Sequence, residues 1–100
     1  MFTHIVMWKL KETAGGRSRA DNAALIKEQF EELANMIDGL THLEVGIDVL
    51  RTDASADVVL FTQFESRAAY DAYDRHPAHK ALAASITELR DERRVIDYET

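Results

Sequence analysis

The residues of this chain best suited to proton chemistry lie in the run YDAYDRHPAH, residues 70–79. Tyr73 precedes His76 by three residues, and His76 precedes His79 by three. An imidazole, with an ordinary pKa of about 6.5, can take and return a proton at neutral pH. A neighbouring phenol can hold or polarise a substrate oxygen. Pro77 disfavours helical geometry at His76 but suits the start of a new helix, so a kink there can aim Tyr73 and His79 at one point.

The same spacing also has a purely structural explanation, which is favoured on spacing alone. In it, His76 caps the second helical segment, His79 forms a local hydrogen bond and Tyr73 packs on the sheet. A metal site is the weakest interpretation, because two imidazoles three residues apart need further ligands. The chain has no cysteine, which excludes disulfides, thiolate metal ligands and a cysteine nucleophile. We expect no cofactor and no metal.

Three further segments hold polar groups whose surroundings matter. His4 lies in an apolar strand, where it is either a buried histidine with one satisfied nitrogen or part of a pocket wall. Asp97 alternates with Val95, and a buried carboxylate needs a partner, for which a histidine is suited. The charged run ELRDERR, residues 88–94, predicts a solvated helix end.

Composition limits the classes of protein to which the chain can belong. It has 100 residues, of which 46% are hydrophobic, and this predicts one domain spanning residues 1–100. The formal charge of −6 argues against partners that are nucleic acids or anionic membranes. No apolar run approaches the roughly 18–20 residues of a membrane-spanning helix, and the N-terminus does not resemble a signal peptide. We therefore expect a cytoplasmic protein.

The hydrophobic periodicity predicts four strands and three helical segments. Gly39 would end the first helix, and Pro77 would separate the other two. The predicted strands cover residues 2–10, 43–49, 57–65 and 95–98; the predicted helices cover residues 18–37, 66–73 and 77–89. This order predicts an α+β protein with the ferredoxin-like βαββαβ arrangement, in which helices cover one face of a four-stranded antiparallel sheet.

The strands carry apolar residues on both faces. In the first strand Val6 and Trp8 share one face, while Ile5 and Met7 share the other. Helices on one side leave the second apolar face uncovered, and large exposed apolar patches mark interaction sites. A second copy packed sheet to sheet about a two-fold axis would cover it. We therefore predict a homodimer formed through the sheet face opposite the helices.

Three motifs give the chain a family resemblance. The opening His4 to Lys11 (HIVMWKLK), the closing Asp97-Tyr98, and above all Tyr73 to His79 (YDRHPAH) resemble the stress-responsive A/B barrel, or Dabb, family. The resemblance spans nearly the whole chain and implies a dimeric α+β barrel. One enzyme branch, typified by the plant olivetolic acid cyclase, closes a linear polyketide by an aldol reaction without a cofactor.

The resemblance also implies roles for particular residues. His79 would be the general acid or base, and Tyr73 would orient a substrate carbonyl. The implied substrate-binding wall consists of His4, Val6, Trp8, Ile26, Phe30, Leu60, Tyr70, Leu82, Ile86 and Asp97. Asp74 and Arg75 stand where the cyclase carries apolar residues, which predicts a more polar mouth of the pocket.

Two functions from different classes follow. The first is a cofactor-independent, cyclase- or lyase-like enzyme that uses Tyr73 and His79 for proton transfer on a small hydrophobic carbonyl compound. The second is a non-catalytic dimer that resists stress or binds a small hydrophobic ligand. The shape of the cavity between sheet and helices, and whether it reaches Tyr73 and His79, distinguishes them.

Overall fold

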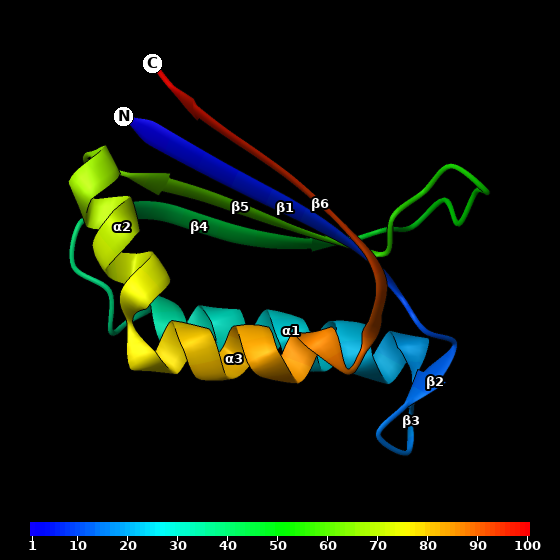
Figure 1. The fold of residues 1–100 in the computed structure, drawn as a ribbon. Coiled ribbons are helices and arrows are strands. Elements are labelled where there is room, and N and C mark those ends of the chain that lie inside the picture. Colours follow the sequence, from blue (N-terminus) through cyan, green and yellow to red (C-terminus); the bar gives the residue numbers. More distant parts are fainter.

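The computed structural model describes all of residues 1–100 and has two layers, a sheet and the helices on one of its faces (Figure 1). The four long strands pair antiparallel in the order β4-β5-β1-β6, and a short hairpin forms a second sheet. The elements are β1 (Phe2–Leu10), β2 (Thr13–Ala14), β3 (Arg17–Ser18), α1 (Arg19–Ala34), β4 (Leu40–Ile47), β5 (Val58–Phe64), α2 (Arg67–Arg75), α3 (Pro77–Thr87) and β6 (Arg90–Glu99). The predicted ferredoxin-like α+β fold is confirmed.

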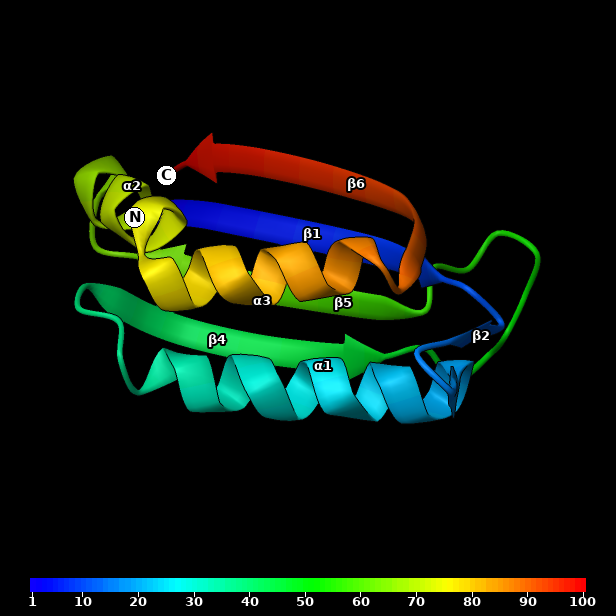
Figure 2. The same ribbon diagram turned by 60° about the horizontal axis from the view of Figure 1, so that its bottom comes forward.

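β1 is a central strand, with β5 on one side and β6 on the other (Figure 2). Its side chains alternate, so that His4, Val6 and Trp8 are buried toward the helices while Met7 is exposed on the other face. Directly paired residues share a face; Val6 lies opposite Leu60 of β5 and Val95 of β6. The apolar core is formed between this inner face and the helices.

α1 begins where the sequence predicts and ends earlier. The Ser18 hydroxyl accepts a hydrogen bond from the Asp21 N–H (3.2 Å), which satisfies a free donor of the first turn. The helix ends at Ala34 with Asn35 as its C-cap, so the prediction that it continues to Ile37 is wrong. Asn is a poor residue for a helix interior and a common one at helix ends, and Ile37 still packs against the core from the following turn.

β4 and β6 both differ from their predicted bounds. β4 is shifted toward the N-terminus, so Val49 lies outside the sheet with 85% of its surface exposed. Residues 90–94 belong to β6, and the prediction that residues 88–94 form a solvated helix end is wrong. Backbone pairing with β1 makes residues 90–94 a strand. Their charged side chains are well tolerated because β6 is an edge strand, where charges discourage pairing with other molecules.

The predicted kink separates α2 from α3 at His76. Its backbone is extended (φ −62°, ψ 130°), and Pro77 occupies the first turn of α3. The His76 Nδ1 accepts a hydrogen bond from the Ala78 N–H (3.0 Å), so this imidazole caps the helix. The capping role expected for His76 is confirmed, and this ring nitrogen is occupied.

The uncovered sheet face is rich in apolar side chains. By register, Ile5 lies opposite Phe61 and Ile96, and Met7 lies opposite Val59. Exposure reaches 44% for Met7 and 56% for Ile96. We call this surface the open face and define it by Ile5, Met7, Val59, Phe61, Ile96 and Tyr98. None of the helices has the length and apolar composition needed to cross a membrane.

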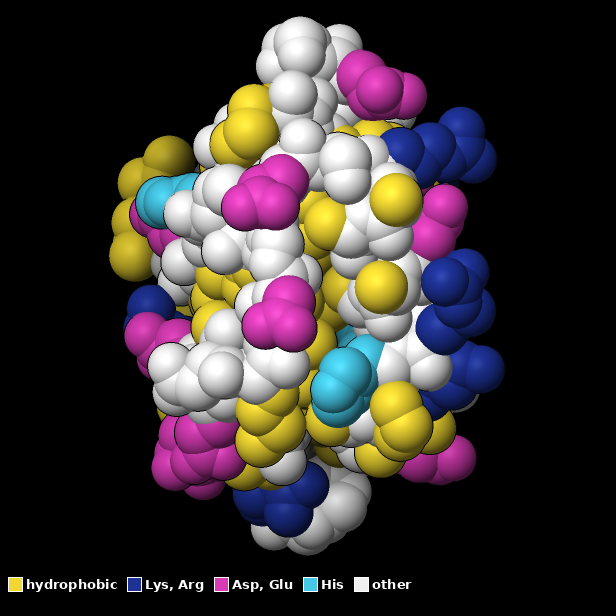
Figure 3. All heavy atoms as spheres, turned by 90° about the vertical axis from the view of Figure 1, so that its left-hand side faces the viewer, with side chains coloured by type: hydrophobic (Ala, Val, Ile, Leu, Met, Phe, Trp, Pro, Cys, Tyr) yellow, Lys and Arg dark blue, Asp and Glu magenta, His cyan; other side chains and the backbone are white.

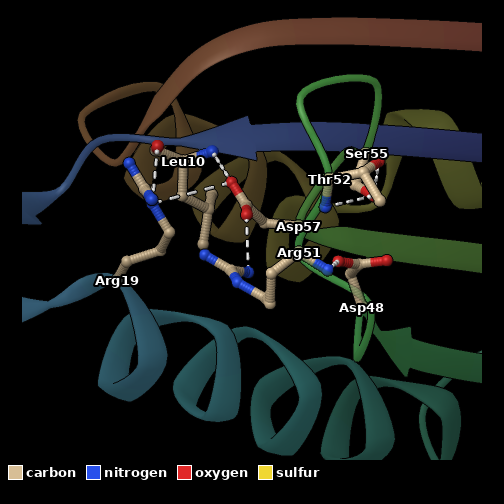
Figure 4. Close-up of polar contacts among 7 residues, drawn as sticks. All are labelled: Leu10, Arg19, Asp48, Arg51, Thr52, Ser55 and Asp57. Carbon is tan, nitrogen blue, oxygen red and sulfur yellow. Dashed lines mark hydrogen bonds and ion pairs between the residues drawn. The ribbon is translucent and has the colours of Figure 1, made fainter.

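A buried carboxylate fixes the long β4–β5 loop, residues 48–57, to the end of β1 (Figure 4). The Asp57 Oδ2 accepts a hydrogen bond from the Leu10 N–H (2.7 Å), and Oδ1 accepts one from the Arg51 guanidinium (2.9 Å). Arg19, the first residue of α1, brings a second guanidinium to 3.8 Å. Asp57 therefore joins the loop, the central strand and the start of α1.

We expect Asp57→Asn to lower the free energy of unfolding by about 2–4 kcal/mol, because it removes a buried charge and leaves its cationic partners uncompensated. Urea unfolding followed by circular dichroism measures the change. Asp53→Asn, in an exposed part of the same loop, is the matched control and should be within about 0.5 kcal/mol of the wild type. Equal stabilities for the two variants would contradict this role of Asp57.

Candidate functional site

A cavity of about 260 Å³ lies between the inner face of the sheet and α3. Its apolar wall comes from β1, α1, β5 and α3, and its polar groups come from β1, the α2–α3 segment and β6. The lining residues are His4, Val6, Trp8, Phe30, Leu60, Asp74, His79, Ala83, Ile86, Thr87, Arg90 and Arg93. A mainly apolar pocket of about 300–1,000 Å³ with a few convergent polar groups is the usual form of a small-molecule site. This cavity is slightly smaller, and half of its lining residues are polar.

His79, in the first turn of α3, places an imidazole on this cavity. Its Nδ1 lies 3.2 Å from the Asp74 backbone carbonyl oxygen. A carbonyl oxygen can only accept, so Nδ1 carries the proton and Nε2 keeps its lone pair. Partial burial lowers the pKa of His79 below its ordinary value, against the opposing effect of the Asp74 contact. His79 is thus held as a neutral imidazole that can accept a proton.

Tyr73 lies behind His79 and does not border the cavity. The two ring centroids are 4.3 Å apart, and only 1% of the tyrosine surface is exposed. Its hydroxyl is buried without a hydrogen-bond partner, which is costly for a polar group. Burial, with a contribution from the neighbouring Tyr70, raises the pKa of the Tyr73 phenol. The hydroxyl therefore keeps its proton and is a hydrogen-bond donor with no acceptor.

His4 and Asp97 form a pair across β1 and β6, where they are register partners. The His4 Nδ1 lies 2.5 Å from the Asp97 Oδ1, and the histidine side chain is buried. A carboxylate accepts, so His4 donates this hydrogen bond from Nδ1. The expected histidine partner of Asp97 is therefore present, but the expected burial of the carboxylate is not, because the Asp97 side chain is 38% exposed.

Tyr70 packs against this pair, with its ring centroid 4.9 Å from that of His4. Burial, together with the nearby Asp74 and Asp97 carboxylates, raises the pKa of Tyr70 to about 12. Tyr70 and Asp97 line a separate, shallow pocket beside the C-terminal end of β6.

The structure therefore divides the residues named from the sequence into two groups. Those that border the cavity are His4, Val6, Trp8, Phe30, Leu60, His79 and Ile86. Those that do not border it are Ile26, Tyr70, Tyr73, Leu82 and Asp97. Trp8 stacks on Phe30 at 5.7 Å and forms one wall, so its indole does not close the space. Asp74 lines the cavity, in line with the polar mouth expected from the sequence.

Sequence analysis missed Thr87, Arg90 and Arg93 as cavity residues. The two arginines lie in the run that predicts a helix end, and they share a face only because the pairing of β6 with β1 is irregular at Asp91, which no local pattern predicts. Nowhere does the structure gather three or more His, Asp or Glu side chains into a possible metal site.

The fold and the cavity together define the class of protein. It is a ferredoxin-like α+β protein whose partly apolar pocket, on the helical side of the sheet, is lined by two histidines. The profile of the stress responsive A/B barrel domain, Dabb, matches residues 2–100, and the chain belongs to this family. No curated protein matches the sequence.

Three solved structures illustrate how widely the fold is shared. A dimeric ferredoxin-like protein of unknown function from Thermobifida fusca is 19% identical (TM-score 0.85), with 99% of this chain and 90% of that chain covered. A hypothetical protein of Arabidopsis thaliana is 28% identical (TM-score 0.75; 99% and 87% covered). Hydroxynitrile lyase from Passiflora edulis is 17% identical (TM-score 0.79; 97% and 90% covered).

We expect His79 to titrate below pH 6.5, because burial disfavours its charged form. Its ring protons, followed by NMR during a pH titration, should show a midpoint under that value. The unfolded chain then binds the proton more tightly than the folded one, so stability should fall as the pH drops from about 6.5 through the folded-state pKa. A midpoint at or above 6.5 would show that the Asp74 contact outweighs burial.

Proposed function

We propose that this protein is a cofactor-independent enzyme that transfers protons on a small hydrophobic carbonyl compound, with His79 as the base. The observation that supports this most directly is the His79 imidazole, which borders a partly apolar cavity while its Nδ1 is occupied. Its lowered pKa keeps it in the proton-accepting form near neutral pH. The apolar walls of the cavity would hold the hydrocarbon part of the substrate.

The proposed step begins at the carbon next to the substrate carbonyl. His79 Nε2 removes a proton from that carbon, the electron pair of the broken C–H bond moves toward the carbonyl oxygen, and an enolate forms beside an imidazolium. The enolate carbon can then attack a second carbonyl of the same molecule, and the imidazolium returns the proton to the new alkoxide. The same steps in reverse break the carbon–carbon bond that this attack forms. Cyclase-like and lyase-like reactions can therefore use the same His79 imidazole.

Tyr73 would stabilise the negative oxygen of the enolate. Its hydroxyl is protonated, buried and without a partner, and its ring contacts His79. A donor that finds its acceptor only in the enolate would favour the charged state over the ground state. Because Tyr73 lies behind the cavity wall, this role requires the His79 ring to move aside when substrate enters.

His4 and Asp97 would complete the proposed site from the opposite wall. The carboxylate fixes the imidazole through Nδ1, which leaves His4 Nε2 as a second polar group on the cavity. A substrate hydroxyl could be bound there while His79 acts on the adjacent carbon. A hydroxynitrile lyase shares this fold, so the scaffold accommodates enzymes.

We also propose that the protein is a homodimer formed through the open face. The exposed Met7, Ile96 and Tyr98 side chains lie on that face, and burying apolar area there would stabilise association. The cavity lies on the helical side of the sheet and stays accessible in such a dimer.

The second candidate is a dimer that binds a small hydrophobic ligand without turnover. The small volume of the cavity and the covered Tyr73 hydroxyl favour this alternative. It predicts that His79 variants change ligand affinity or stability, while no probe reacts.

We expect the protein to accelerate deuterium incorporation next to the carbonyl of neutral aryl ketones such as benzoylpropionamide in D₂O, followed by NMR. His79→Gln should lower the rate by at least about 100-fold, because it removes the base. Tyr73→Phe should lower the rate by about tenfold or more while leaving ketone binding nearly unchanged. His42→Gln, an exposed position on β4, is the control. Binding without exchange in the wild type would favour the non-catalytic dimer.

We expect Met7→Asp to shift the protein from dimer to monomer, because it places a charge in the centre of the open face. Analytical ultracentrifugation at micromolar concentration measures the change. Met36→Asp makes the same substitution at an exposed position after α1 and should leave the dimer intact. A wild-type protein that sediments as a monomer would overturn the proposed interface.

A further inference from the structure

Two arginines border the cavity without a carboxylate partner. Arg90 and Arg93 both line it, and the ion pairs of the molecule involve neither. The chain as a whole is acidic, with a formal charge of −6. Two unpaired arginines at one cavity are therefore unexpected from its net charge. In the view onto the end of the molecule where α2 meets α3, Lys and Arg side chains lie along one edge with Asp or Glu side chains between them (Figure 3).

An irregularity in β6 places both arginines on the cavity side. Residues three apart in a regular strand point to opposite faces. Here Lys9 pairs with Glu92 while Leu10 pairs with Arg90, so Asp91 is an extra residue without its own partner on β1. This β-bulge brings Arg90 back to the face occupied by Arg93, which lies opposite the inward-facing Trp8. Bulges commonly re-aim a side chain next to a functional site.

The charges around the cavity leave an excess of positive charge. Arg90 and Arg93 face one acidic lining residue, Asp74, which lies beyond ion-pair distance of both. Burial is the largest influence on the pKa values of Tyr73 and His79, and the positive charge of Arg93 acts to lower both. Arg93 is therefore close enough to act on the groups of the proposed site.

We propose that the ligand of this cavity is a small hydrophobic keto acid, whose carboxylate is bound by Arg90 and Arg93 while its apolar part lies against Trp8, Phe30 and Ile86. Guanidinium groups bind carboxylates through paired, charge-assisted hydrogen bonds. His79 lines the same cavity, so a carboxylate held at β6 leaves the carbonyl end of the molecule free to approach the imidazole. This inference rests on the proposed function for the location of the site and adds the substrate class.

The test compares two probes of the same shape, benzoylpropionate and its neutral amide, benzoylpropionamide. Titration calorimetry should show that the wild-type protein binds the carboxylate about tenfold more tightly than the amide. Arg93→Gln should remove most of that difference by weakening carboxylate binding more than amide binding, and Arg93→Lys should restore part of it. Lys80→Gln removes the same charge at an exposed position on α3 outside the cavity and is the matched control.

The outcomes separate this inference from the proposed catalysis. Two results would overturn the keto-acid inference even if deuterium exchange still depends on His79. One is equal affinity for the two probes, and the other is a carboxylate preference that Lys80→Gln reduces as much as Arg93→Gln does. Arg93-dependent binding of benzoylpropionate without exchange would support the inference and contradict the catalysis. Raising the salt concentration should weaken carboxylate binding and leave amide binding unchanged, because screening acts on the charge pair alone.

Discussion

The register of β1 between β5 and β6 is the constraint on which the rest of the structure depends. Because side chains alternate along a strand, a slip of one residue would move His4, Val6 and Trp8 from the helical side to the open face. The same register sets Asp97 beside His4 and Arg93 beside Trp8. The cavity, the His4–Asp97 pair and the free arginines all follow from one pattern of backbone hydrogen bonds.

Much of the fold could be predicted from the sequence because its signals are local. Alternation marks the first three long strands, Ser18 caps α1 and Pro77 begins α3. The errors lie where tertiary pairing overrides local preference. Residues 90–94 are charged and have no strand signal of their own, and only the neighbouring β1 makes them a strand. The predicted end of α1 is too late because the apolar helical spacing continues to Ile37, although Asn35 is of a type common at helix ends.

The candidate site was less predictable because it joins segments distant in sequence. The kink at Pro77 accounts for the contact between Tyr73 and His79, and alternation places His4 and Asp97 on the inner face. Whether a side chain borders a cavity depends on what packs in front of it, which spacing does not encode. Tyr73 lies behind His79 for this reason, and Arg90 reaches the cavity only through the bulge at Asp91, a feature of pairing between strands.

The cavity lies on the helical side of the sheet, and the open face lies on the other side. This arrangement has a kinetic consequence. Two protomers joined through their open faces would be back to back, with about 10 Å between the stacked sheets and each entrance directed outward. No side chain of one copy would complete the other's pocket, and a molecule released from one pocket would reach the other only through bulk solvent. Such a pair would present two separate pockets with no channelling between them.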